Sequence, residues 1–88
     1  MDNIELVLMY DFYNLLLDDK EKIWFEYYYF DNMSLQEISE NYGVSRNAVH
    51  KSLKKVKEKL IDYENKLHLI EKSNNNSTFF YFNALLLH

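Results

Sequence analysis

The chain of 88 residues contains no cysteine and no proline, and its single glycine is Gly43. Without cysteine there is no disulfide, no thiolate metal site and no thiol nucleophile, and we expect a protein of the reducing cytoplasm. Without proline, no residue removes a backbone donor from the interior of a helix, so long helices are permitted. The one glycine marks the position that best tolerates a positive φ.

The sequence also lacks the hydrophobic segments of a membrane span and of a signal peptide. No apolar run approaches the roughly 20 residues that cross a bilayer. The N-terminal stretch MDNIELVLMYDF has neither a basic region nor a small-residue cleavage site. We therefore expect no membrane span and no signal peptide. Hydrophobic residues nevertheless make up 48% of the chain and aromatic residues 17%, which is rich for one small domain with a marginal core.

Groups from which active sites are built are also sparse. The three histidines, His50, His68 and His88, show no metal-ligand spacing with one another or with carboxylates. There is no glycine-rich phosphate loop. Asp18 and Asp19 stand where we expect a helix to begin, and carboxylates there accept hydrogen bonds from free backbone amides. We therefore expect no enzyme, no metal and no cofactor.

Charge is unevenly distributed along the chain. Residues 1–44 hold two lysines against ten acidic residues, a formal charge of −8, whereas residues 45–72 hold eight basic and four acidic residues, a formal charge of +4. Charge runs are usually solvated helix faces, but segregation of this size exceeds what solvation requires. A basic segment in a protein of formal net charge −4 therefore points to an anionic partner.

Hydrophobic spacing and capping residues predict two helices before residue 32. Apolar residues at helical spacing predict the first helix over 3–17. Asp18 followed by Glu21 has the pattern of a capping box, which opens a second helix over about 19–31. The run YYYF in the second helix also has strand propensity, but the cap and the flanking pattern favour a helix. The apolar positions of the first helix are Ile4, Val7, Leu8, Phe12, Leu15 and Leu16.

Two more helices are expected further along the chain. A second capping box, Ser34 with Glu37, opens a short helix that Gly43 ends. Ser45 can cap the next helix, which we expect to run from position 46 to 72. The sequence thus predicts an all-α protein with a long C-terminal helix.

The stretch from Ser34 to Lys54 has the spacing of a helix-turn-helix. A short turn between two steeply crossing helices needs a residue that tolerates positive φ, and Gly43 supplies it. The close approach of the helices needs a small residue on the first, and Ser39 can be that residue. An ordinary helical corner would share this apolar core, which we expect to comprise Leu35, Ile38, Val44, Val49 and Leu53.

Once those residues face inward, the outward positions near the start of the last helix are fixed. They can all donate hydrogen bonds to phosphates or base edges, as an ordinary helical corner would not require. A helix N-terminus also favours phosphate. Arg46 and Asn47 would approach base edges, and the other side chains would contact phosphates. The full candidate set for duplex DNA is Ser45, Arg46, Asn47, His50, Lys51, Lys54 and Lys55.

The sequence SLQEISENYGVSRNAVHKSLKK resembles region 4 of bacterial sigma factors, which is a helix-turn-helix unrelated to winged helices. Over roughly residues 10–72 the chain also resembles the YlxM family, on the stretches DFYNLLLDDK, GVSRNAV and DYENKLHL. The resemblance implies an all-α helix-turn-helix protein encoded beside signal recognition particle genes. It further implies a regulatory role in that pathway. The C-terminal SNNNSTFFYFNALLLH departs from the charged continuation of the family.

A heptad pattern follows the helix-turn-helix. Apolar residues alternate at spacings of four and three, as in a coiled coil. Lys59 and Lys66 could then pair with Glu64 and Glu71 of a second copy. The alternative is that the same residues pack on the first helix of their own chain. The candidate self-association seam continues from Val49 and Leu53 and comprises Val56, Leu60, Tyr63, Leu67 and Ile70.

The remaining segment divides into a polar part and an apolar part. We expect one helical domain over residues 1–72, a polar break over 73–77, and then the uncharged tail Phe79–His88. The tail can cover an exposed apolar face, lie at a subunit interface, or stay unpacked and promote aggregation.

Two functions from different classes remain open. One is duplex DNA binding by a sigma-like regulator, which the acidic pI of 5.2 opposes. The other is an adaptor that binds the protein or the RNA of the signal recognition particle without reading a DNA sequence.

Overall fold

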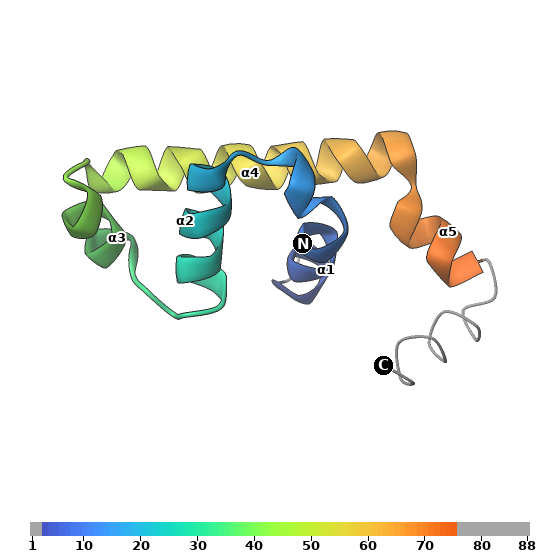
Figure 1. The fold of residues 1–88 in the computed structure, drawn as a ribbon, viewed down its shortest axis with the longest axis horizontal. Coiled ribbons are helices and arrows are strands. Elements are labelled where there is room, and N and C mark those ends of the chain that lie inside the picture. Colours follow the sequence, from blue (N-terminus) through green and yellow to red (C-terminus); the bar gives the residue numbers. More distant parts are fainter. Residues whose placement is uncertain (1–2, 76–88) are drawn as a thin grey trace.

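The computed structural model describes residues 3–75, and every regular element in that range is a helix. Helix α4 (Arg46–Leu67) runs along the length of the molecule, and α1 (Asn3–Tyr13), α2 (Asp19–Tyr29) and α3 (Leu35–Tyr42) all contact it on one side (Figure 1). A short 3₁₀ turn, η1 (Asn14–Leu16), follows α1, and α5 (Leu69–Asn75) follows α4. The prediction of an all-α fold is confirmed for these residues.

The buried face of α1 differs from the predicted one. The buried positions are Leu6, Tyr10 and Tyr13, joined by Leu17 after the 3₁₀ turn. Ile4 is 81% exposed and points to solvent, whereas Phe12 of the predicted apolar positions is half-buried and packs against the core. The predicted apolar positions left out Tyr10 and Tyr13, but a tyrosine ring adds large apolar area to a core when its hydroxyl finds a partner at the edge.

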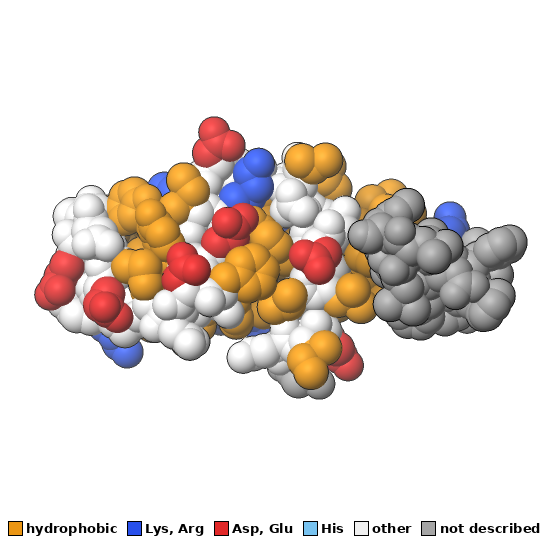
Figure 2. Space-filling view, turned by 60° about the horizontal axis from the view of Figure 1, so that its bottom comes forward, with side chains coloured by type: hydrophobic (Ala, Val, Ile, Leu, Met, Phe, Trp, Pro, Cys, Tyr) orange, Lys and Arg blue, Asp and Glu red, His pale blue; other side chains and the backbone are white. Residues whose placement is uncertain are grey.

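The first helix is also shorter than the predicted 3–17. It ends at Tyr13, and the backbone tightens into η1 before Leu17. Leu15 in that turn is 86% exposed. The face of the molecule in Figure 2 accordingly shows hydrophobic side chains at the surface with carboxylates scattered among them.

Two neighbouring hydrophobic clusters share α4. The first joins α1, α2 and the middle of α4 through Leu6, Tyr10, Tyr13, Leu17, Phe25, Val56 and Leu60. The second joins α2, α3 and the start of α4 through Trp24, Ile38, Val49 and Leu53. Within the first cluster, the rings of Tyr10 and Phe25 are stacked with centroids 4.2 Å apart. The first cluster therefore fixes α1 and α2 on α4, and the second fixes the helix-turn-helix.

The predicted capping box of α2 is present, and it is linked to α4. The Asp18 side chain accepts a hydrogen bond from the Glu21 amide at 2.8 Å, and the Glu21 carboxylate accepts one from the Asp18 amide at 3.0 Å. The other oxygen of Glu21 lies 2.7 Å from the Lys59 ammonium. Glu21 is buried, and a buried charge is costly unless it has partners. The backbone amide of Asp18 and the ammonium group of Lys59 supply them. The α2 helix itself ends at Tyr29, earlier than the predicted 31.

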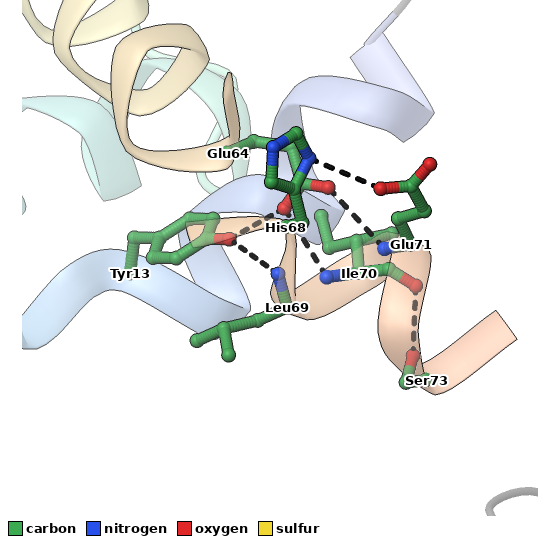
Figure 3. A network of polar contacts seen from close by, with 7 residues as sticks. All are labelled: Tyr13, Glu64, His68, Leu69, Ile70, Glu71 and Ser73. Atoms are coloured by element: carbon green, nitrogen blue, oxygen red, sulfur yellow. Dashed lines mark hydrogen bonds and ion pairs between the residues drawn. The ribbon is translucent and has the colours of Figure 1, made fainter. Parts of the chain in front are cut away.

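The long C-terminal helix is interrupted, contrary to the prediction of one helix over 46–72. His68 adopts a left-handed conformation with φ 54°, which ends α4 at Leu67. Figure 3 shows how the joint is held: the Glu64 carboxylate accepts hydrogen bonds from the amides of Ile70 and Glu71 at 3.1 and 3.2 Å. Because Glu64 thereby caps α5, the chain turns there rather than continuing straight.

Tyr13 ties this joint to α1. Its hydroxyl donates to Glu64 and accepts from the Leu69 amide at 3.1 Å (Figure 3). The positions from 73 to 75, expected as a polar break, belong to α5 instead. The predicted tail Phe79–His88 lies outside the described residues.

The candidate seam is used largely inside the chain. Val56 and Leu60 are fully buried against α1 and α2. Tyr63 is half-buried and donates a hydrogen bond to the Leu16 carbonyl at 3.3 Å, and Ile70 lies beyond the break, on α5. Only Leu67, 44% exposed, remains open on α4, so a second copy could reach the rest only if α1 and α2 moved away.

The charged residues flanking the seam also have partners in their own chain. Lys59 pairs with Glu21, and Lys66 lies 3.0 Å from Asp62. Glu64 caps α5, and Glu71 lies 3.1 Å from His68. Among the described residues these lysines and glutamates thus have partners in their own chain, and pairing between two copies stays a prediction.

Alkaline pH should destabilise the fold. Burial and a hydrogen bond to Glu26 raise the pKa of Tyr10, and burial and a hydrogen bond to Glu64 raise the pKa of Tyr13. The hydrogen bond to Glu21 likewise raises the pKa of Lys59. The folded state thus holds these protons more tightly than the unfolded state. We expect thermal melts to show stability constant up to about pH 10 and falling above it.

The variant Tyr13→Phe tests the contribution of the Tyr13 hydroxyl to this loss of stability. It should be less stable at neutral pH, because Glu64 loses a donor, but its stability should fall less steeply above about pH 10. Equal alkaline slopes for the variant and the wild type would contradict the assignment to Tyr13.

Candidate nucleic-acid interface

Gly43 makes the turn of the helix-turn-helix. Its φ of 64° and ψ of 32° are left-handed, and its amide and that of Val44 both donate to the Ser39 carbonyl. The predicted capping box of α3 is present, with Ser34 accepting from the Glu37 amide at 3.0 Å and Glu37 accepting from the Ser34 amide at 2.9 Å. Each end of α3 is therefore fixed by the residue that the sequence indicates.

Replacing Gly43 tests the turn. An added Cβ would meet no atom within 4 Å, so the cost of Gly43→Ala comes from the backbone conformation alone. We expect a loss of about 1–2 kcal/mol in the free energy of unfolding, measured by chemical denaturation. Gly43→Asn should lose less, because asparagine enters the left-handed region more readily. Equal losses for the two variants would contradict a backbone origin.

The core between α3 and α4 agrees with the prediction at four of five positions. Ile38 and Val49 are fully buried and Leu53 is buried, and Ser39 is buried where the helices approach. Leu35 is half-buried and packs against the same cluster. Val44 is 39% exposed, so its place in the predicted core is wrong. It lies in the turn after Gly43, where the chain leaves α3, and Trp24 of α2 completes the core instead.

Ser45 begins α4 as predicted. Its hydroxyl oxygen accepts a hydrogen bond from the Ala48 amide at 3.0 Å. The hydroxyl hydrogen remains available, so Ser45 can cap the helix and still donate to a phosphate. The adjoining helix N-terminus carries a partial positive charge of its own.

The candidate DNA-contacting residues are all exposed. Ser45 is the N-cap of α4 and Arg46 is its first residue, and the other five lie in its first three turns, on its outer side and flanks. By helical spacing, Asn47, Lys51 and Lys54 form the central stripe, with His50 and Lys55 on its flanks. This set comprises Ser45, Arg46, Asn47, His50, Lys51, Lys54 and Lys55.

The positive charge of this surface is uncompensated. Within the part of the chain that the structure describes, Arg46, Lys51, Lys54 and Lys55 form no ion pair, whereas Lys59 and Lys66 further along α4 do. The same surface has hydrogen-bond donors with no partner and no carboxylate among them. Such a surface can bind a polyanion without first breaking internal salt bridges.

The prediction overlooked Lys57. It is half-buried and follows His50 and Lys54 along one flank of α4, where it faces the end of α2. The spacing of His50, Lys54 and Lys57 by four and three could have indicated a shared face. The position of α2 beside that face could not be obtained from spacing along one helix.

A family profile described as "Putative helix-turn-helix protein, YlxM / p13 like" matches residues 1–83. The chain belongs to the UPF0122 family. In this UPF0122 protein the helix-turn-helix is formed by α3 and α4, and the expected resemblance to YlxM proteins is confirmed.

Individual UPF0122 proteins match most of the chain. It is 44% identical over 64 residues to one from Shouchella clausii, which covers 73% of this chain and 59% of that protein. It is 45% identical over 71 residues to one from Caldanaerobacter subterraneus (81% of this chain, 61% of that protein), and 48% identical over 61 residues to one from Streptococcus pneumoniae (69% and 56%). The matched part thus spans only about 56% to 61% of these relatives' length.

Among residues 3–75 no group of three or more histidine, cysteine, aspartate or glutamate side chains could hold a metal ion. Over the same range no helix is both long and apolar enough to cross a membrane.

Proposed function

We propose that this UPF0122 protein binds duplex DNA through the first three turns of α4 and acts as a regulator. The observation that carries the proposal is the exposed set of Arg46, Asn47 and three lysines with no internal ion pair, placed directly after a helix-turn-helix turn. In such motifs the N-terminal residues of the second helix enter the major groove. Arg46 and Asn47 are the residue types that pair with guanine and adenine edges.

The acidic N-terminal half is compatible with this binding mode. Helices α1, α2 and α3, which carry most of the carboxylates, cover one side of α4 (Figure 1), and by helical spacing Lys51 and Lys55 of α4 point away from its buried residues. Salt screens charges that are separated by more than about 8–10 Å. The carboxylates therefore oppose DNA binding less than the formal charge of −4 suggests.

A role in the signal recognition particle pathway is part of the proposal and rests on the resemblance to YlxM proteins. The alternative function is an adaptor for the protein or RNA of that particle. The observation that favours the adaptor is the exposure of large apolar side chains in α1 and η1, such as Ile4 and Leu15. Protein contacts use such surfaces, and duplex DNA does not.

Fluorescence anisotropy with labelled duplexes, including the DNA upstream of the protein's own gene, tests the regulator. We expect selective binding relative to a shuffled duplex of equal composition, with log K falling linearly as log salt rises. Arg46→Ala should reduce that selectivity by about 1–3 kcal/mol. No selective binding at low salt would falsify the regulator, and co-purification with the signal recognition particle would then support the adaptor.

A further inference from the structure

A hollow of about 390 Å³ lies beside the candidate DNA surface. It is bounded by the C-terminal end of α2, the start of α3 and one flank of α4. Tyr28 and Tyr29 form one wall, and His50, Lys54 and Lys57 form the other. Its volume is within the usual range of about 300–1,000 Å³ for small-molecule sites.

The polar groups of the hollow suit an anion. Its lining residues include two lysines, a histidine and two tyrosines but no acidic residue, although acidic residues outnumber basic ones by 14 to 10 in the chain. Within the described residues none of these five side chains has a hydrogen bond or an ion pair. Burial raises the pKa of Tyr29, so its hydroxyl keeps its proton at neutral pH and can donate.

The apolar groups of the hollow suit a flat ring. Leu35 and Leu53 contribute its apolar lining. The rings of Tyr28 and Tyr29 are nearly perpendicular, with centroids 4.9 Å apart, and Tyr29 is itself packed on Phe25. One tyrosine ring is thus held by the core, while Tyr28 is 37% exposed and presents a surface on which a ring can stack.

We propose that this hollow binds a small anion that carries a flat ring, of which a nucleoside monophosphate is the simplest biological example. The phosphate would accept hydrogen bonds from Lys54 and Lys57, and the base would stack on Tyr28 above the leucines. The inference does not depend on DNA binding, because paired bases of a duplex are stacked inside the helix and cannot enter such a hollow. A ligand there would engage His50 and Lys54, so it would compete with DNA where DNA binds.

Calorimetric titration of the full chain with adenosine monophosphate, without DNA, tests the site. We expect saturable binding, and we expect inorganic phosphate and adenosine each to bind at least about tenfold more weakly, because each lacks half of the interactions. Lys57→Gln should raise the Kd for the nucleotide by about tenfold. Lys57 is chosen because it is not part of the candidate DNA set.

Lys55→Gln is the matched control, since it removes an exposed lysine of the same helix that does not line the hollow. Its Kd for the nucleotide should equal that of the wild type. Tyr28→Ala should also weaken binding, with circular dichroism confirming that it is folded. Absence of saturable binding at millimolar nucleotide would overturn the proposal, as would equal losses in Lys57→Gln and Lys55→Gln, or equal affinities for phosphate and nucleotide.

Discussion

Leu60→Ala is expected to lower the free energy of unfolding by about 2–5 kcal/mol, whereas Leu15→Ala should change it by less than about 0.5 kcal/mol. The two substitutions remove the same atoms. Leu60 is fully buried between α1, α2 and α4, and its loss leaves a cavity in the first hydrophobic cluster. Leu15 is 86% exposed, so its removal leaves none. Urea denaturation of both variants measures the difference.

The same pair distinguishes core packing from self-association. If Leu60 stabilises a single chain, the midpoint of unfolding is independent of protein concentration in the wild type and in both variants. A midpoint that rises with concentration in the wild type, and no longer does so in Leu60→Ala, would instead place Leu60 at an interface between copies. Sedimentation of Leu67→Asp adds a check at the one seam position on α4 that remains exposed.

The double variant Lys51→Ala, Lys54→Ala should bind duplex DNA about 10- to 100-fold more weakly at about 0.1 M salt. Each lysine that neutralises a phosphate releases counterions, so the slope of log K against log salt should also become shallower by about 0.9 per lysine. Both side chains are exposed and without an ion pair among the described residues, so their removal should leave stability unchanged. Anisotropy over a salt series measures affinity and slope together.

Lys72→Ala is the control for this experiment, because it removes one exposed lysine on α5, beyond the break in the long helix. It should alter neither the affinity nor the slope. The double variant should weaken selective and shuffled duplexes equally, since phosphates carry no sequence information. A slope identical to that of the wild type would exclude these two lysines from the interface.

Local chemistry was enough to predict the elements that begin and end with capping residues. Asp18 with Glu21, Ser34 with Glu37, and Gly43 stand at helix ends because their side chains or backbone freedom satisfy amides and carbonyls within a few residues. The exposure of Lys51, Lys54 and Lys55 on α4 followed in the same way from helical spacing. Interactions between residues only a few positions apart can be predicted directly from the sequence.

The errors arose where residues distant in sequence decide the outcome. Whether α1 buries Ile4 or Tyr10 depends on Glu26 and Phe25 of α2, which hold the hydroxyl and the ring of Tyr10. The end of the long helix depends on Glu64 and Tyr13, which lie 51 positions apart. Neither partner can be identified from spacing along one helix.

The sequence by itself determined the helical class, the helix-turn-helix and its basic surface, because caps, helical period and charge act over a single turn of chain. Only the tertiary structure decided which face of α1 is buried and that Val56 and Leu60 of the heptad pattern lie in the core of one chain. It also decided that Lys57 lines the same hollow as Tyr28 and Tyr29. Those outcomes depend on how helices pack against one another. Close packing requires that the surfaces of different helices fit together, and the residue pattern of one helix does not show this fit.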